Sequence, residues 1–242
     1  EIQSFFLFSI FLRKILFFDY SIYLLKKLIN IDKNNYIYLF HLGKAYQGQE
    51  KFKYAIKYLK FSLKNKSDLE DAINSLAVCL IEIGKYDEAE KILMDGIKKN
   101  KNNKFFYSNL GKIYNETEHF NKSIKFYNLG LDIDMNDPTI NFGKAICLLK
   151  KGNINESFKY LNYRTNGYLL TNEFKSRFKS SRLTNLENIK NKKILVIFEQ
   201  GLGDTIQFCR YIKVLLEEGA KVFFIPQKNL SLLMRSLNRN EN

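Results

Sequence analysis

Small residues recur every 34 positions through the first two-thirds of this chain, and large apolar residues recur in step with them. The first register of small residues is Ser9, Gly43, Ala77, Gly111 and Ala145, and the second is Ser21, Ala55, Ala89, Ser123 and Ser157. A third register holds bulky side chains at Leu25, Leu59, Leu93, Tyr127 and Leu161. Five copies of one spacing in three registers indicate a tandem repeat.

The two small registers lie twelve residues apart, a spacing that suits the two arms of a helix hairpin. Helix axes approach to about 8–10 Å only where the contacting side chains are small. The bulky residue follows the second small residue by one helical turn, on the same face, and would therefore cover the contact. The pattern predicts an α-solenoid of about five hairpins over residues 2–171.

Turn residues agree with this division. Gly84 and Gly152 fall between paired helices, where glycine readily takes the left-handed conformation that ends a helix. The polar segments 30–35 and 132–138 separate one unit from the next, and Pro138 suits the first turn of a new helix.

The segment Phe5–Phe18 is very apolar, which raises the alternative of a membrane anchor. It is shorter than the roughly 20 residues needed to cross a bilayer, and Arg13 and Lys14 interrupt it. Ser9 also keeps the repeat register. We therefore expect a repeat helix and no membrane span. As the terminal helix it would leave an apolar outer face uncovered unless more chain precedes Glu1.

The repeat resembles the tetratricopeptide repeat, whose signature is small, aromatic, small and large. Two units fit it closely: Gly43/Tyr46/Ala55/Leu59 and Gly111/Tyr114/Ser123/Tyr127. The fit weakens toward the end, where Lys144 stands in a register that is apolar at Phe8, Leu42, Leu76 and Leu110. The resemblance implies a concave groove that binds a peptide or protein segment. The expected groove positions are Phe40, Lys44, Asp71, Asn74, Phe105, Lys112 and Phe142.

A formal net charge of +14 invites a nucleic-acid hypothesis. The lysines, however, are spread over every unit, no arginine-rich run is present, and the groove positions mix aromatic, acidic and basic groups. We therefore expect solvated helix faces and no nucleic-acid partner. Cys79 and Cys147 share one repeat register beside apolar neighbours, and Cys209 also falls in an expected helix. Without metal-ligand spacing, we expect no metal and buried, reduced thiols in a cytoplasmic protein.

The repeat stops after Leu161, and a different kind of segment follows. Residues 172–191 are polar and predict a linker. The apolar run Lys193–Phe198 is typical of a buried parallel strand. A glycine turn at 199–205, a helix over 206–218, a strand over 220–225 and a helix over 230–237 are expected next. This order predicts the start of a Rossmann-like α/β domain over 192–242.

Chemistry in that domain would sit at the glycine turn. Gly201 and Gly203 lack a Cβ, so backbone N–H groups there could approach a ligand closely, with Thr205 beside them. Asp204 follows the first strand, at the edge where open α/β sheets place their sites. The dinucleotide fingerprint is not met, because Ile206 replaces its third glycine. The alternative role for Asp204 is a plain helix N-cap.

The segment Lys193–Tyr211, with its Glu-Gln-Gly-Leu-Gly-Asp-Thr-Ile-Gln-Phe core, is similar to bacterial proteins that join these repeats to a glycosyltransferase domain of the heptosyltransferase type. The resemblance implies a GT-B fold of two Rossmann-like halves and a nucleotide-sugar donor. It also implies that Asp204 is the general base that deprotonates the acceptor hydroxyl. Only 50 residues run from Lys193 to Asn242, so we expect an inactive fragment that needs no cofactor of its own.

Two hypotheses remain open at this stage. In the first, the repeats present a protein or glycan acceptor to a glycosyltransferase in the parent protein. In the second, the chain is a non-catalytic scaffold for protein–protein interaction. The nucleocytoplasmic O-linked N-acetylglucosamine transferase also joins such repeats to a GT-B enzyme, but its asparagine ladder is reduced here to a single Asn109.

Overall fold

The computed structural model describes residues 2–161, 163, 183, 186–197 and 201–237. The chain divides into two compact units, Glu1–Thr165 and Asn166–Asn242. Most of the linker expected over 172–191 lies outside the described residues.

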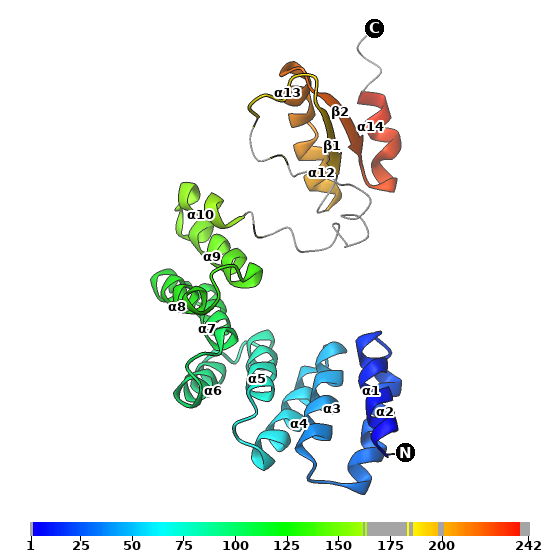
Figure 1. Ribbon diagram of the computed structural model, residues 1–242, viewed down its shortest axis with the longest axis vertical. Coiled ribbons are helices and arrows are strands. Elements are labelled where there is room, and N and C mark those ends of the chain that lie inside the picture. Colours follow the sequence, from blue (N-terminus) through cyan, green and yellow to red (C-terminus); the bar gives the residue numbers. More distant parts are fainter. Residues whose placement is uncertain (1, 162, 164–182, 184–185, 198–200, 238–242) are drawn as a thin grey trace. The chain divides into compact units, whose positions relative to one another are not determined.

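The described part of the first unit is built from helix hairpins that follow one another along the chain (Figure 1). Helices with odd numbers are called first helices, and those with even numbers are called second helices. The hairpins are α1 (Ile2–Lys14) with α2 (Phe18–Ile31), α3 (Tyr36–Gly48) with α4 (Phe52–Asn65), α5 (Glu70–Glu82) with α6 (Tyr86–Lys99), α7 (Lys104–Glu116) with α8 (Phe120–Ile133), and α9 (Pro138–Lys151) with α10 (Ile154–Leu161).

The small registers form the seam of each hairpin, as the sequence predicts. A Cβ added to Gly43 would lie 2.7 Å from Cγ of Leu59, and one added to Gly111 would lie 2.5 Å from Cε1 of Tyr127. The hydroxyl of Ser123 donates to the carbonyl of Gly111 at 2.8 Å. The bulky register therefore covers the seam, and the close approach of the two helices requires the small residues.

The turn inside each hairpin repeats one backbone conformation. Five residues spaced by the repeat period have positive φ: Leu16 (65°), Glu50 (58°), Gly84 (74°), Glu118 (61°) and Gly152 (91°). The left-handed turn expected at the two glycines is confirmed. The same conformation is also imposed on three residues that carry a Cβ, at a cost of about 1–2 kcal/mol each.

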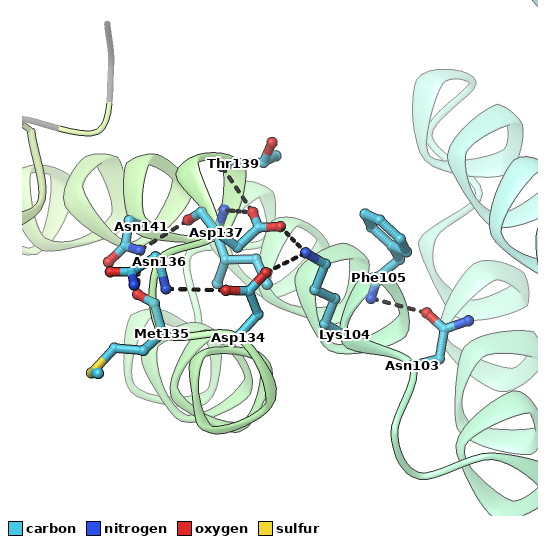
Figure 2. A network of polar contacts seen from close by, with 10 residues as sticks. Asn103, Lys104, Phe105, Asp134, Met135, Asn136, Asp137, Thr139 and Asn141 are labelled. Carbon is cyan, nitrogen blue, oxygen red and sulfur yellow. Dashed lines mark hydrogen bonds and ion pairs between the residues drawn. The ribbon is translucent and has the colours of Figure 1, made fainter. Parts of the chain in front are cut away.

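Successive hairpins are joined by a polar clamp (Figure 2). The ammonium of Lys104, at the start of α7, lies 2.6 Å from a carboxylate oxygen of Asp134 and 2.6 Å from one of Asp137. Asp134 ends α8, and Asp137 caps α9 by accepting hydrogen bonds from the backbone N–H groups of Thr139 and Ile140. The carboxylates, Asp134 first, raise the pKa of Lys104.

An equivalent clamp occurs one repeat earlier, with a carboxylate in place of the ammonium and two amides in place of the two carboxylates. Glu70, at the start of α5, accepts hydrogen bonds from the side chains of Asn100 and Asn103 at 2.7 and 2.6 Å. These three residues precede Lys104, Asp134 and Asp137 by one period. Different chemistry at one register therefore ties the first helices α5 and α7 to the loops that follow their hairpins.

The first helices lie on the inner side of the first unit. Each of them contacts the first helix of the next hairpin, from α1 with α3 to α7 with α9, whereas second helices make no comparable contact with one another in the described part. Elements that approach more closely must lie inside a curve. The core between the helices is apolar, and its largest fully buried side chains in this unit include Leu25, Leu42, Leu59, Leu76, Leu93, Phe106 and Leu110.

The described part of the second unit is a β–α–β arrangement. It comprises β1 (Lys193–Ile197), α12 (Leu202–Phe208), α13 (Tyr211–Glu217), β2 (Lys221–Ile225), the 3₁₀ turn η2 (Lys228–Leu230) and α14 (Ser231–Leu237). The strands pair in parallel, with Lys193 opposite Lys221 and Ile197 opposite Ile225. Two short parallel strands are thus present where the sequence predicts the start of a Rossmann-like domain.

Three local expectations for this unit are wrong. The single helix expected over 206–218 breaks at Cys209 and Arg210, between α12 and α13. The strand expected to be buried is only half-buried over Ile194–Ile197, because the described elements cover it incompletely. Cys209 is half-buried, in contrast to Cys79 and Cys147, which are fully buried free thiols.

None of the described helices is long and apolar enough to cross a bilayer. Within the same residues, no cluster of three or more histidine, cysteine or acidic side chains is placed to hold a metal ion.

Candidate functional site

The candidate site is the inner face formed by the first helices, because the expected groove residues all lie on α3, α5, α7 or α9. Of these residues, Phe105 is 54% exposed and Asp71 is also exposed. The others are half-buried, namely Phe40, Lys44, Asn74, Lys112 and Phe142. The face therefore offers partly exposed aromatic, amide and charged groups from consecutive repeats.

Neighbouring first helices are linked across this face by polar pairs. The ammonium of Lys112 on α7 lies 2.7 Å from Oε1 of Glu82 on α5. The amide of Asn109 donates to Oδ1 of Asn74 at 3.3 Å. Lys150 on α9 lies 3.7 Å from Glu116 on α7. Lys112 and Asn74 are thus brought into one polar row, while the expected residues Phe40 and Phe142 lie outside it.

The polar row uses two acidic residues that the sequence reasoning missed. Glu82 and Glu116 stand in one repeat register, and Lys150 follows them in the same register. That periodic alignment was the available signal. It could not show which lysine each carboxylate meets, because the partner lies on another helix.

The end of the inner face formed by α1 and α3 is cationic, and its cations are not held in ion pairs of the kind seen on α7 and α9. Arg13 on α1 and Lys44 on α3 make no ion pair with any described residue, and Nε of Arg13 is buried without a hydrogen-bond partner there. Burial and the charge of Arg13 lower the pKa of Lys44, and burial lowers that of Arg13. Loss of hydration is the largest cause of both shifts, and the carboxylate of Asp71 offsets part of the shift of Lys44.

His41 sits among these cations. Burial, and then the charges of Arg13 and Lys44, lower the pKa of His41 to about 4. Its ring packs edge-on against those of Phe6 and Phe40, at centroid distances of 5.2 and 5.0 Å. His41 is therefore neutral near pH 7, so the positive charge at this end belongs to Arg13 and Lys44.

The second unit holds the other expected site residues. Gly201 caps α12 with φ −64° and ψ 170°, which other residues also adopt, and a Cβ added to Gly203 would contact nothing within 4 Å. Thr205 is buried, and its hydroxyl points back to the carbonyl of Gly201 at 3.4 Å. Asp204 lies within α12, and its side chain is outside the described part of the structure. Neither glycine is required by local backbone geometry.

Comparison with known proteins agrees with the repeat architecture. Family models match at residues 18–96, described as anaphase-promoting complex, cyclosome, subunit 3, and at 106–137, described as tetratricopeptide repeat. The low calcium response locus protein H of Yersinia pestis is 30% identical over 133 residues, which are 52% of this chain and 75% of that protein. The chain is a tetratricopeptide repeat protein.

Solved structures share the fold of this tetratricopeptide repeat protein. MamA residues 41 to the end from Desulfovibrio magneticus RS-1 superpose with a TM-score of 0.59 at 16% identity, over 74% of this chain and 97% of that one. The pilF protein of Pseudomonas aeruginosa superposes with a TM-score of 0.61 at 16% identity, over 72% of this chain and 79% of its own. Identities this low support the fold alone.

Proposed function

We propose that this tetratricopeptide repeat protein is a non-catalytic scaffold that binds a protein or peptide segment along the inner face of its first helices. The observation that carries the proposal is the continuity of that face over α1 to α9, with partly exposed side chains from consecutive repeats. Repeat arrays commonly use such extended surfaces to bind extended partners.

The charges on the inner face indicate that the bound segment carries an acidic group. Lys112 and Lys150 form ion pairs with carboxylates of the protein itself, whereas Arg13 and Lys44 form none with a described residue, and only the more distant Asp71 acts on Lys44. A segment that places an acidic side chain or a terminal carboxylate near Arg13 and Lys44 would supply the missing counter-charge. An apolar residue of the same segment would cover Phe105, which is 54% exposed.

Peptide selection tests this function. A random peptide library is displayed on phage and selected on the immobilised full chain, and recovered peptides are titrated by fluorescence anisotropy. Lys44→Glu is expected to weaken binding by about tenfold or more, because it places a like charge beside the acidic group. Added salt should weaken wild-type binding as well.

Matched variants on a second helix serve as controls. Lys53→Glu makes the same charge reversal on α4 and is the control for Lys44→Glu. Phe105→Ala on α7 should also weaken binding, because it removes the exposed ring, and Phe61→Ala on α4 is its control. The controls should bind like the wild type. Equal losses in Lys44→Glu and Lys53→Glu, or the recovery of no peptide that binds saturably, would contradict the proposal.

A second candidate function is glycosyl transfer by a Rossmann-like second unit. The parallel pairing of β1 with β2 favours it, because Gly201 and α12 follow the first of two parallel strands in the chain, the position from which α/β enzymes commonly draw site residues. Asp204 would be the general base, with Gly201, Gly203 and Thr205 near the substrate. Release of nucleoside diphosphate from ADP- and UDP-sugars tests this candidate. The assay uses a protein in which this unit is joined to a second GT-B half, because this chain by itself is expected to be inactive. Turnover that Asp204→Asn abolishes without a change in thermal unfolding would support glycosyl transfer, and no turnover in that protein would leave the scaffold function.

A further inference from the structure

The outward side of α2 carries a row of large apolar and aromatic side chains. Tyr20 is 65% exposed, Tyr23 is 59% exposed and Ile31 is 67% exposed. Spacings of three and eight residues place all three on one face of the helix. Leu16, in the turn before the helix, is 72% exposed, and the ring of Phe17 (55% exposed) lies 6.3 Å from that of Tyr20, centroid to centroid. We call these five residues the outer ridge.

The exposure of the outer ridge does not depend on what precedes α1. The next three hairpins have a hairpin on each side, and their residues in the same five registers are exposed, except for the half-buried Glu88. Those residues are Glu50, Lys51, Tyr54, Lys57 and Asn65, then Gly84, Lys85, Glu88, Lys91 and Lys99, then Glu118, His119, Lys122, Lys125 and Ile133. Neighbouring hairpins therefore leave this side of the array open to solvent. The first hairpin differs from the others in being apolar or aromatic in all five registers.

The surroundings of the outer ridge are basic. Together α2 and α4 carry six lysines against one acidic residue, Asp19, which accepts a hydrogen bond from the side chain of Gln49 at 2.7 Å. Of these lysines, Lys60 pairs with Glu88 on α6, and the others form no ion pair with a described residue. The next second helix, α6, has four acidic residues against three lysines. The apolar ridge therefore coincides with the basic part of the outer surface.

We propose that the outer ridge and the lysines of α2 and α4 bind the surface of a bilayer that contains anionic lipids. Second helices lie on the outer side of the curved array, so the ridge protrudes. A lipid surface accepts a protruding apolar ridge without a matching pocket, as it accepts the apolar face of an interfacial helix.

The residue types also suit the lipid interface. Tyrosine and lysine side chains combine an apolar body with a polar end that can reach the headgroups. Nζ of Lys27 lies 5.5 Å from the ring centroid of Tyr23, so these two groups already lie together at the ridge. Anionic headgroups would supply the counter-charge that the lysines lack within the protein, and each lysine near such a surface strengthens binding by about fivefold. This inference does not rest on peptide binding, because the inner face consists of first helices and the ridge belongs to a second helix.

Co-sedimentation of the full chain with phospholipid vesicles tests the proposal. The wild type is expected to bind vesicles of equal parts phosphatidylglycerol and phosphatidylcholine, and to bind pure phosphatidylcholine vesicles about tenfold more weakly or worse. Leu16→Glu and Tyr20→Glu should each weaken binding by about tenfold or more, because a carboxylate then enters the interface. Both changes copy residues that other hairpins carry in the same registers, Glu50 and Glu88, and circular dichroism should show an unchanged fold. A wild type that stays in the supernatant, or a Tyr20→Glu variant that binds like it, overturns the proposal.

A matched pair of isoleucines separates the ridge from the net charge of the chain. Ile31→Glu on α2 and Ile133→Glu on α8 make the same change in one register. Only Ile31→Glu should weaken vesicle binding, and equal losses would overturn the role of the ridge. Self-association that Tyr20→Glu abolishes, without vesicle binding by the wild type, would assign the ridge to a protein contact and also overturn the proposal.

A fluorescent reporter tests whether the ridge enters the lipid. The chain has no tryptophan, so Tyr23→Trp introduces a single one. Its emission should shift to shorter wavelength on addition of vesicles and should be quenched by lipids with brominated acyl chains. Leu129→Trp on α8 is the control and should show neither effect. Vesicle binding that leaves the emission of Tyr23→Trp unchanged would show that only lysines contact the headgroups, and would overturn insertion of the ridge.

Discussion

The ammonium of Lys144 on α9 donates a hydrogen bond to the hydroxyl of Tyr160 on α10 at 2.8 Å and lies 4.1 Å from the centroid of the same ring. Lys144 is only 7% exposed and occupies the register of Leu42, Leu76 and Leu110. The departure from the apolar pattern is thus accommodated by one aromatic partner in the same hairpin.

This pair should be energetically coupled. Tyr160→Ala is expected to lower the free energy of unfolding by about 1–3 kcal/mol, because it leaves a buried ammonium without its partner. The loss should be much smaller in a Lys144→Leu background, where no buried charge remains. Urea denaturation of the four proteins in the double-mutant cycle measures the coupling. Additive losses would show that Tyr160 acts only by packing.

Acid should destabilise the first unit through His41. The pKa of His41 in the folded protein, about 4, lies below its ordinary value of 6.5, so the unfolded chain binds a proton more readily. The stabilisation is complete above pH 6.5 and is lost as the pH falls toward 4, by up to about 3 kcal/mol. His41→Asn, which copies Asn109 of the same register, should remove this loss of stability between pH 6.5 and 4. Urea denaturation between pH 4.5 and 7.5 measures it, and parallel pH profiles for the two proteins would contradict the prediction.

Replacing a residue that carries a Cβ by glycine at a left-handed turn should increase stability. Glu118→Gly should raise the free energy of unfolding by about 1 kcal/mol or less, because relief at φ 61° exceeds the added entropy of the unfolded chain. Gly84→Ala should lower it by a similar amount, since a Cβ there meets nothing within 4 Å and only backbone strain acts. Thermal unfolding measures both changes. Glu118→Ala is the control, and an equal gain in that variant would rule out a backbone origin.

In the fourth hairpin, a second substitution at the seam should restore stability that a first one removes. The ring of Tyr127 lies between Gly111 and Gly143, where added Cβ atoms would come within 2.5 and 2.9 Å of it. Gly111→Ala is therefore expected to cost about 1–3 kcal/mol through overpacking. Adding Tyr127→Leu should recover much of that loss, because Ala77 and Leu93 form this combination in the third hairpin. Denaturation midpoints compare the variants, and a double variant as unstable as the sum of its parts would contradict the explanation.

Sequence reasoning was most successful where an interaction lies within one repeat. Ser123 and Gly111 belong to one hairpin, and the turn at Gly152 connects adjacent helices, so a fixed spacing along the chain is also a fixed position in space. The seams, the turns and the helix start at Pro138 are confirmed for that reason.

The structure decided what depends on contacts between repeats. Lys104 forms ion pairs with Asp134 and Asp137, about one repeat later in the chain. Lys112 forms an ion pair with Glu82 of the preceding hairpin. Periodicity marks such residues as equivalent but gives neither their partners nor the packing of one hairpin on the next. Likewise, the helix break at Cys209 and the partial burial of β1 depend on how the elements pack within the second unit. The amino-acid pattern therefore determined the repeating unit of this protein. Only the tertiary structure decided which charges on the inner face form ion pairs, because ion pairing depends on side chains that distant segments bring together.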